Sequence, residues 1–127
     1  MSKRILVIDD EAAVCKSFAL ALENSEHEVE TAANGKAGLD LFGQEKYDLV
    51  FLDLKMPVMS GVETLLKLRE KNKTIPVYIV TAFHKEFLDE LADARKKEID
   101  FELLIKPLGL AQIREIVGAI LEGGVHV

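Results

Sequence analysis

The sequence has almost no cysteine, which excludes one common way of stabilising a small protein. Cys15 is the single cysteine, so the chain has no internal disulfide. The histidines His27, His84 and His126 are scattered along the chain and form no Cys/His cluster with the spacing of zinc ligands. The chain therefore gives no sign of a disulfide framework or of a structural zinc site.

Long apolar runs and basic runs are also missing. No apolar stretch approaches the length of a transmembrane helix, and the segment Ile5–Ile8 is too short for the apolar region of a signal peptide. The formal net charge is −6, and there is no run of basic residues to neutralise phosphates. We therefore expect a cytoplasmic protein with no membrane contact and no direct nucleic-acid binding.

Length and composition are ordinary for one globular domain. The chain has 127 residues, of which 49% are hydrophobic and 30% are charged. A chain of this length buries roughly two-thirds of its unfolded surface on folding. We expect one domain over residues 1–122, with residues 123–127 as a tail or the start of a linker.

Five short apolar runs have the character of strands buried on both faces of a sheet. They comprise Ile5–Ile8, Val29–Ala32, Leu49–Leu52, Val77–Val80 and Phe101–Ile105. The second run differs from the others because Glu28 and Glu30 alternate with Val29 and Thr31, as in a half-exposed edge strand.

Segments with helical periodicity lie between and after these runs. In the fourth of them the apolar residues are Leu88, Leu91 and Ala92, which we expect to face the core. Repeated strand–helix units predict an α/β fold in which a doubly wound parallel sheet is covered by helices on both faces.

Polar residues that can perform chemistry follow four of the five predicted strands. The first strand ends in Asp9 and Asp10, the third in Asp53, the fourth in Thr81 and the fifth in Lys106. Ligands of open α/β sheets bind beyond the carboxyl ends of the strands. These side chains are therefore expected to converge there.

Such a cluster suits a metal ion and a phosphoryl group. Three crowded carboxylates need a cation or raised pKa values, and ligation by oxygen alone favours Mg²⁺. Lys106 is suited to neutralise phosphoryl oxygens and Thr81 to donate a hydrogen bond to them. One carboxylate can then act as the nucleophile, since aspartate accepts phosphoryl groups in enzymes.

Each residue also has a structural interpretation when it is taken singly. Asp9 or Asp10 can cap the helix that begins near Glu11, Thr81 can cap another helix, and Lys106 can be a solvated surface charge. Asp53 can be a polar strand end. The functional interpretation depends on the combination, because separate strand ends carry compatible roles.

The sequence resembles the response regulator receiver family over nearly its whole length. The resemblance is carried by Ile5–Glu11 (ILVIDDE), Asp53–Gly61 (DLKMPVMSG), Thr81–Ala82 and Lys106–Pro107. It implies a flavodoxin-like sheet with strand order 2-1-3-4-5. It also implies a Lys106–Pro107 peptide bond in the cis form.

The resemblance further implies roles for individual residues. Asp53 matches the phosphoacceptor, Asp9 and Asp10 match the acidic pair that holds Mg²⁺, and the backbone carbonyl of Lys55 is a further metal ligand. Thr81 matches the switch hydroxyl and Lys106 the lysine that contacts the phosphate. The implied donor is a sensor histidine kinase or a phosphotransfer protein. The implied output is a downstream protein partner or an effector domain absent from this sequence.

Some positions depart from the family pattern or vary within it. The aromatic residue expected three positions before the lysine is replaced by Leu103, and Phe101 is either its substitute or plain core. The interval from Thr81 to Lys106 is longer than usual, which predicts an unusual output surface near the fourth helix. Lys55 and Phe83 are predicted to prolong the life of the phosphorylated form, Lys55 by pairing with the acidic cluster and Phe83 by shielding water.

Two other functions compete with this interpretation. An aspartate-nucleophile phosphatase of the haloacid-dehalogenase type needs a second carboxyl two residues after the nucleophile, where this chain has Lys55. A receiver-like interaction module that is never phosphorylated is the other alternative. We expect a phosphoacceptor that assists its own phosphorylation and dephosphorylation and is not otherwise an enzyme.

Overall fold

The computed structural model describes residues 2–82 and 85–122. Strands and helices alternate along the chain in the order β1 (Arg4–Ile8), α1 (Ala12–Ala21), β2 (Glu28–Ala32), α2 (Gly35–Gln44), β3 (Leu49–Asp53), α3 (Gly61–Lys71), β4 (Val77–Thr81), the short 3₁₀ helix η1 (Lys85–Phe87), α4 (Leu88–Lys96), β5 (Glu102–Ile105) and α5 (Leu110–Leu121). Each predicted strand is present to within a residue at either end.

The strands form one parallel sheet in the order β2-β1-β3-β4-β5. This is the predicted doubly wound order. β1 and β3 lie inside the sheet and are almost wholly buried, whereas β2 is an edge strand with exposed and half-buried residues. The glutamate alternation of β2 therefore correctly indicated an edge.

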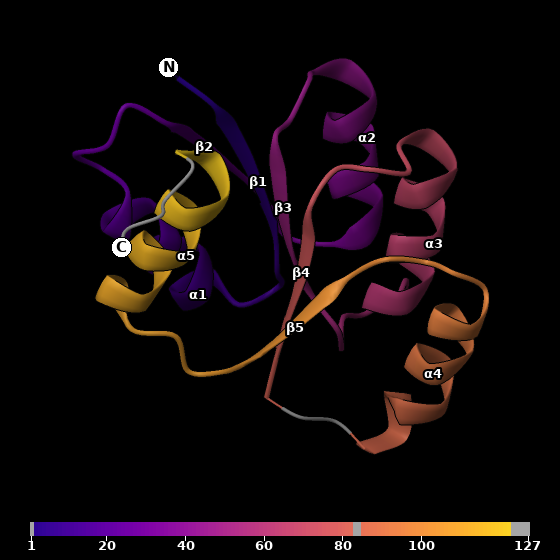
Figure 1. The fold of residues 1–127 in the computed structure, drawn as a ribbon. Helices are drawn as coiled ribbons and strands as arrows, with labels where there is room; N and C mark the ends of the chain where they lie inside the picture. Colours follow the sequence, from indigo (N-terminus) through magenta and orange to yellow (C-terminus); the bar gives the residue numbers. More distant parts are fainter. Residues whose placement is uncertain (1, 83–84, 123–127) are drawn as a thin grey trace.

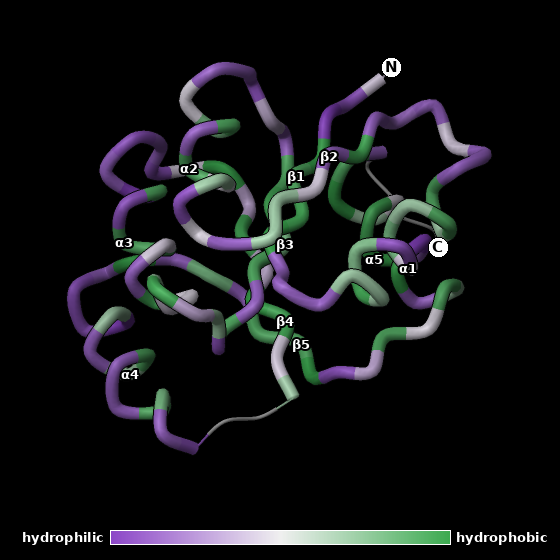
Figure 2. Tube along the Cα trace, turned by 180° about the vertical axis from the view of Figure 1, so that it is seen from behind, coloured by the Kyte–Doolittle hydropathy of each residue, from purple (hydrophilic) through white to green (hydrophobic). Residues whose placement is uncertain are grey.

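Helices cover both faces of the sheet, with α1 and α5 on one side and α2, α3 and α4 on the other (Figure 1). Side chains of successive strand residues point to opposite faces. In β1, Ile5 and Val7 pack with Phe18 of α1, while Leu6 and Ile8 enter the core on the opposite face. Hydrophobic positions concentrate along the central strands, and the connecting segments are largely hydrophilic (Figure 2).

Local capping explains where two of the helices begin. The Asn34 side chain accepts a hydrogen bond from the Ala37 amide at 2.8 Å, and the Ser60 hydroxyl accepts one from the Glu63 amide at 3.2 Å. Both contacts satisfy amides that have no partner within the helix. They start α2 and α3 directly after loops that leave the carboxyl end of the sheet.

The predicted core face of α4 is wrong at two positions. Leu91 is buried as expected, but Leu88 is 45% exposed and Ala92 is exposed, while Ala94 is buried instead. Leu88 is the first residue of α4, and the two buried residues of the helix, Leu91 and Ala94, belong to the hydrophobic core on this face of the sheet. Apolar spacing alone did not reveal which side of a short helix meets its neighbour.

Among the described residues, no helix combines the length and apolar character needed to cross a bilayer.

Candidate functional site

The residues predicted to converge do lie at one edge of the sheet. Asp53 and Thr81 are the last residues of β3 and β4, and Asp9 and Lys106 directly follow β1 and β5. Because the strands are parallel and in register, their carboxyl ends meet. Carboxylate oxygens of Asp9, Asp10 and Asp53 lie within 4.8 Å of one another.

Lys106 forms ion pairs with two carboxylates of this cluster and with Glu11. Its Nζ lies 3.0 Å from Oδ2 of Asp9, 3.3 Å from Oδ1 of Asp53 and 2.7 Å from Oε1 of Glu11. Its side chain is only 13% exposed, so the solvated-charge interpretation is wrong. Burial alone would lower the pKa of Lys106, but hydrogen bonds to Glu11 and Asp9 outweigh it, and the net shift is upward.

Thr81 is positioned by its strand beside Lys106. It is buried, its Cα pairs with that of Ile105, and its carbonyl accepts a hydrogen bond from the Lys106 amide at 2.8 Å. The helix-cap interpretation of Thr81 is also wrong, since α4 begins at Leu88. The peptide bond that follows, Lys106–Pro107, is cis, as the family resemblance implied.

The carboxylates are held in an environment that disfavours their charge. Burial, and then the neighbouring charge of Asp9, raise the pKa of Asp53 to about 6, although Lys106 acts in the opposite direction. Burial also raises the pKa of Asp9. For Asp53 the pKa in the fold exceeds its ordinary value of 3.8. Its contribution to stability is therefore greatest at low pH and is lost as pH rises through about 6.

The donor set fits a hard divalent cation. Three carboxylates within 4.8 Å supply oxygen ligands alone, and one of them, Asp10, is exposed to solvent. Burial disfavours the negatively charged forms of Asp9 and Asp53, and a bound cation would offset that negative charge. Mg²⁺ favours this ligand type and keeps some of its waters. The metal role of the Lys55 backbone carbonyl stays a prediction.

The loop between β3 and α3 owes its path to Gly61. A Cβ on Gly61 would lie 2.1 Å from the Asp53 carbonyl oxygen and 2.7 Å from Cα of Leu54. The Gly61 amide donates to the Leu54 carbonyl at 2.8 Å. The start of α3 therefore packs directly against the residue that carries the central carboxylate, and only glycine permits this approach.

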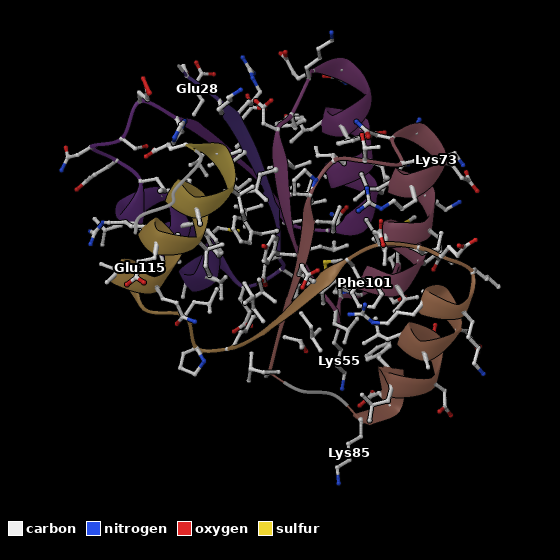
Figure 3. The ribbon with its side chains drawn as sticks, in the orientation of Figure 1. Glu28, Lys55, Lys73, Lys85, Phe101 and Glu115 are labelled. Carbon is white, nitrogen blue, oxygen red and sulfur yellow. The ribbon has the colours of Figure 1, made fainter. Side chains whose placement is uncertain are left out.

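The Lys55 side chain does not join the acidic cluster. Its Nζ lies 3.5 Å from Oε2 of Glu86 in η1, and both side chains are more than half exposed. Lys55 projects away from the sheet toward the segment that contains Lys85 (Figure 3). The predicted pairing of Lys55 with the carboxylates is thus not the one present, and Phe83 lies outside the described residues.

Phe101 and Leu103 occupy opposite kinds of environment. Phe101 is buried in the core next to α4 (Figure 3). The Arg95 guanidinium lies 4.1 Å from the centre of its ring. Leu103 is 39% exposed at the sheet edge. Phe101 is therefore a core residue, and the Arg95 side chain of α4 makes a cation–π contact with its ring.

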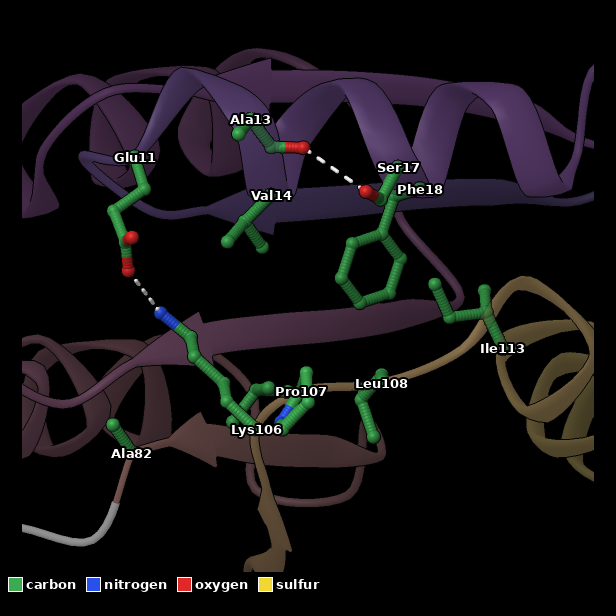
Figure 4. Close-up of a pocket in the computed structure, with 11 residues that line it drawn as sticks. Glu11, Ala13, Val14, Ser17, Phe18, Ala82, Lys106, Pro107, Leu108 and Ile113 are labelled. Atoms are coloured by element: carbon green, nitrogen blue, oxygen red, sulfur yellow. Dashed lines mark hydrogen bonds and ion pairs between the residues drawn. The ribbon is translucent and has the colours of Figure 1, made fainter.

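Sequence reasoning missed the role of Glu11. This residue precedes α1, and its carboxylate makes the shortest of the three contacts to Lys106. The contact lies at one end of a cavity of about 400 Å³ between α1 and the β5–α5 segment, lined by residues that include Val14, Phe18 and Pro107 (Figure 4). The available signal was a third acidic residue after Asp9 and Asp10.

Comparison with known proteins was consistent with this geometry. Residues 5–118 match the model of the response regulator receiver domain. The chain is 33% identical over 121 residues to the alkaline phosphatase synthesis transcriptional regulatory protein PhoP of Bacillus subtilis, covering 95% of this chain and 49% of that protein. It is 32% identical to the response regulator MprA of Mycolicibacterium vanbaalenii, covering 95% and 51%. The chain thus spans about half the length of these relatives.

Solved structures agree with the fold. A CheY-like response regulator receiver domain protein from Methanospirillum hungatei has a TM-score of 0.84 at 28% identity, covering 98% of this chain and 97% of that one. The response regulator TrrA of Thermotoga maritima, in complex with Mg²⁺-BeF, has a TM-score of 0.76 at 32% identity, covering 94% and 99%.

Proposed function

Since the chain belongs to the response regulator receiver family of two-component signalling proteins, we propose that Asp53 accepts a phosphoryl group in a pocket that holds Mg²⁺. One observation carries the proposal. Lys106 contacts Asp53, and Asp53 belongs to a cluster of three carboxylates that could hold a metal ion. The Lys106 ammonium and the candidate metal site therefore both adjoin the proposed nucleophile. A structural ion pair needs only one of these carboxylates.

The transfer step is an in-line displacement at phosphorus. A carboxylate oxygen of Asp53 forms a bond to phosphorus while the bond from phosphorus to the donor's imidazole nitrogen breaks, and that nitrogen keeps the electron pair. Lys106 is already 3.3 Å from Asp53 and neutralises charge on the transferred oxygens. Thr81, at the end of β4, is placed to donate its hydroxyl hydrogen to one of them.

Asp9, Asp10 and Asp53, with the Lys55 backbone carbonyl, are the groups we assign to the metal. Bound Mg²⁺ would supply positive charge and offset the repulsion among the carboxylates. Asp9 has a further task, because its Oδ1 accepts the Glu11 amide at 2.9 Å, which orients the carboxylate. Lys106, by contacting both Asp9 and Asp53, fixes them relative to each other.

The partners follow from this chemistry. We propose a phosphohistidine on a sensor histidine kinase or phosphotransfer protein as the donor, and a downstream protein or a covalently linked effector domain as the recipient of the signal. We place this exchange in the cytoplasm. The chain is proposed to act as a phosphoacceptor rather than as an enzyme that turns over a separate substrate.

Incubation with Mg²⁺ and acetyl phosphate, followed by intact mass measurement, tests the proposal. We expect one phosphate adduct in the wild type and none in Asp53→Ala. Asp40→Ala is the matched control, because Asp40 is an exposed aspartate on α2 and its loss should leave the adduct in place. A wild type without an adduct would favour an unphosphorylated interaction module. Rapid catalytic release of inorganic phosphate would instead favour a phosphatase.

A further inference from the structure

The Glu11 carboxylate spans from the start of α1 to Lys106 (Figure 4). The 2.7 Å contact is shorter than those of Lys106 to Asp9, at 3.0 Å, and to Asp53, at 3.3 Å. Glu11 is the N-cap residue of α1, yet its side chain makes no cap hydrogen bond. The carboxylate is therefore turned away from the helix that it precedes and toward the proposed phosphorylation site.

The Lys106 ammonium is surrounded by carboxylates in this arrangement. An ammonium has three N–H donors and no acceptor. Three carboxylates lie within ion-pair distance of its Nζ, from Asp9, Glu11 and Asp53. A transferred oxygen therefore competes with these carboxylates for the N–H donors of Lys106.

Glu11 is the contact that is released most easily. Its side chain is 60% exposed, whereas those of Asp9 and Asp53 are 3% and 5% exposed. Released into water, the Glu11 carboxylate is hydrated at once, whereas Asp9 and Asp53 are buried and Lys106 is the cation that offsets their charge in this structure. Glu11 is also outside the set of carboxylates close enough to share one metal ion.

We propose that Glu11 is a positioning residue that holds Lys106 before phosphorylation and competes with the phosphoryl oxygens for its ammonium. This inference rests on the proposed function of Asp53. On phosphorylation, Lys106 moves from Glu11 to the phosphoryl group. The ion pair that joins the start of α1 to the β5–α5 segment then opens, at the mouth of the cavity between them.

The contact also sets the charge that an incoming donor meets. The Glu11 carboxylate lies 2.7 Å from Nζ of Lys106 and places a negative charge beside the proposed phosphorylation site. Its negative charge opposes an anionic phosphodonor while it occupies Lys106. Exposed ion pairs contribute about 0.2–1 kcal/mol, which corresponds to a roughly 1.4- to 5-fold change in rate or affinity.

The test compares Glu11→Gln with Glu86→Gln. Both variants replace the charged carboxylate of one ion pair, but Glu86 pairs with Lys55 and not with Lys106. The initial rate of phosphorylation by acetyl phosphate at saturating Mg²⁺ is measured first. We expect Glu11→Gln to be roughly two- to fivefold faster than the wild type and Glu86→Gln to equal it.

A second measurement separates a positioning role from a merely structural one. Calorimetry gives the affinity for Mg²⁺ alone and for beryllofluoride in the presence of Mg²⁺, a noncovalent analogue of the phosphoryl group. In Glu11→Gln, beryllofluoride should bind roughly two- to fivefold more tightly, while Mg²⁺ affinity stays equal or falls because negative charge was removed. A structural defect would weaken both. Glu11→Asp keeps the charge but is one methylene shorter, and it should give an intermediate rate.

The outcomes are distinct. A wild type that takes up no phosphoryl group would overturn the proposed function together with this inference. A wild type phosphorylated at Asp53 and matched in rate by Glu11→Gln would overturn this inference alone. So would an equal acceleration in Glu86→Gln, because the effect would then be one of net charge and not of Lys106.

Discussion

Val58 adopts a backbone conformation that its own side chain disfavours. Its φ is 71°, in the left-handed region, and the residue is 99% exposed in the loop that joins β3 to α3. A β-branched residue in this region is strained by contact between its Cβ substituents and the backbone. The side chain gains no burial in exchange, so the surrounding loop imposes this conformation.

Val58→Asn is expected to raise the free energy of unfolding by about 1 kcal/mol, because asparagine tolerates the left-handed region. Urea denaturation measures the change. Val58→Thr is the control, since threonine keeps the branched Cβ and should not stabilise the protein. Equal stabilisation by both substitutions would show that removing an exposed apolar side chain, and not relief of the backbone, was the cause.

At the scale of elements, the junction between β3 and α3 controls the placement of Asp53. The Gly61 amide donates to the Leu54 carbonyl, and Ser60 caps α3. The helix thereby starts against the last residue of β3. The geometry of the carboxylate cluster thus depends on a helix–strand contact that tolerates no side chain at position 61.

Gly61→Ala is expected to lower the free energy of unfolding by about 1–3 kcal/mol, because its Cβ would meet the Asp53 carbonyl oxygen at 2.1 Å. Phosphorylation by acetyl phosphate should also slow, since α3 must move away from Asp53. Gly43→Ala in α2 is the matched control. Apart from its chain neighbours and the backbone of its own helix, no atom of the described residues lies within 4 Å of a Cβ built there, so this change should stabilise the helix by roughly 0.5–1 kcal/mol. A loss of stability in both variants would contradict the steric explanation.

The edges of the sheet also belong to this scale. In β2, Glu28 and Thr31 are exposed while Val29 and Glu30 are half-buried. In β5, Leu103 and Ile105 are 39% and 50% exposed. α4 places Leu91 and Ala94 in the core, and its Arg95 guanidinium lies over the Phe101 ring. The apolar residues at the end of β5 are therefore less covered than their hydrophobicity predicts.

For the molecule as a whole, the net charge of −6 and the acidic cluster, in which Asp9 and Asp53 are buried, both favour binding of a cation. Lys106 offsets part of the repulsion, yet the pKa of Asp53 is still raised to about 6. A cation that binds the folded state and not the unfolded chain therefore stabilises the protein.

Mg²⁺ is expected to raise the free energy of unfolding of the wild type by about 2.7 kcal/mol when its free concentration is about 100 times its Kd. Asp53→Asn should be more stable than the wild type without Mg²⁺, because a buried charge is removed, and should gain less from the metal. Thermal unfolding with and without EDTA measures both effects. Asp40→Asn, on the exposed face of α2, should respond as the wild type does. An equal gain in Asp53→Asn would place the cation elsewhere.

The sequence by itself determined the sheet and the composition of the site. Apolar runs report burial on both faces, and the residue after each run must lie at the carboxyl edge of a parallel sheet. The polar residues at these strand ends, Asp9, Asp53, Thr81 and Lys106, were therefore predictable as neighbours. The receiver family was recognisable from the motifs around them.

Only the tertiary structure decided which side chains contact one another across elements. It directed Glu11 to Lys106, turned Lys55 toward Glu86, buried Phe101 in place of Leu103 and left Leu88 exposed. Hydrophobic periodicity describes one helix or strand at a time. The contacts between elements depend instead on how far a helix extends beyond the sheet and on the direction in which a long side chain leaves its backbone. The charges at the sheet edge were therefore predictable as a set, but their pairing was not.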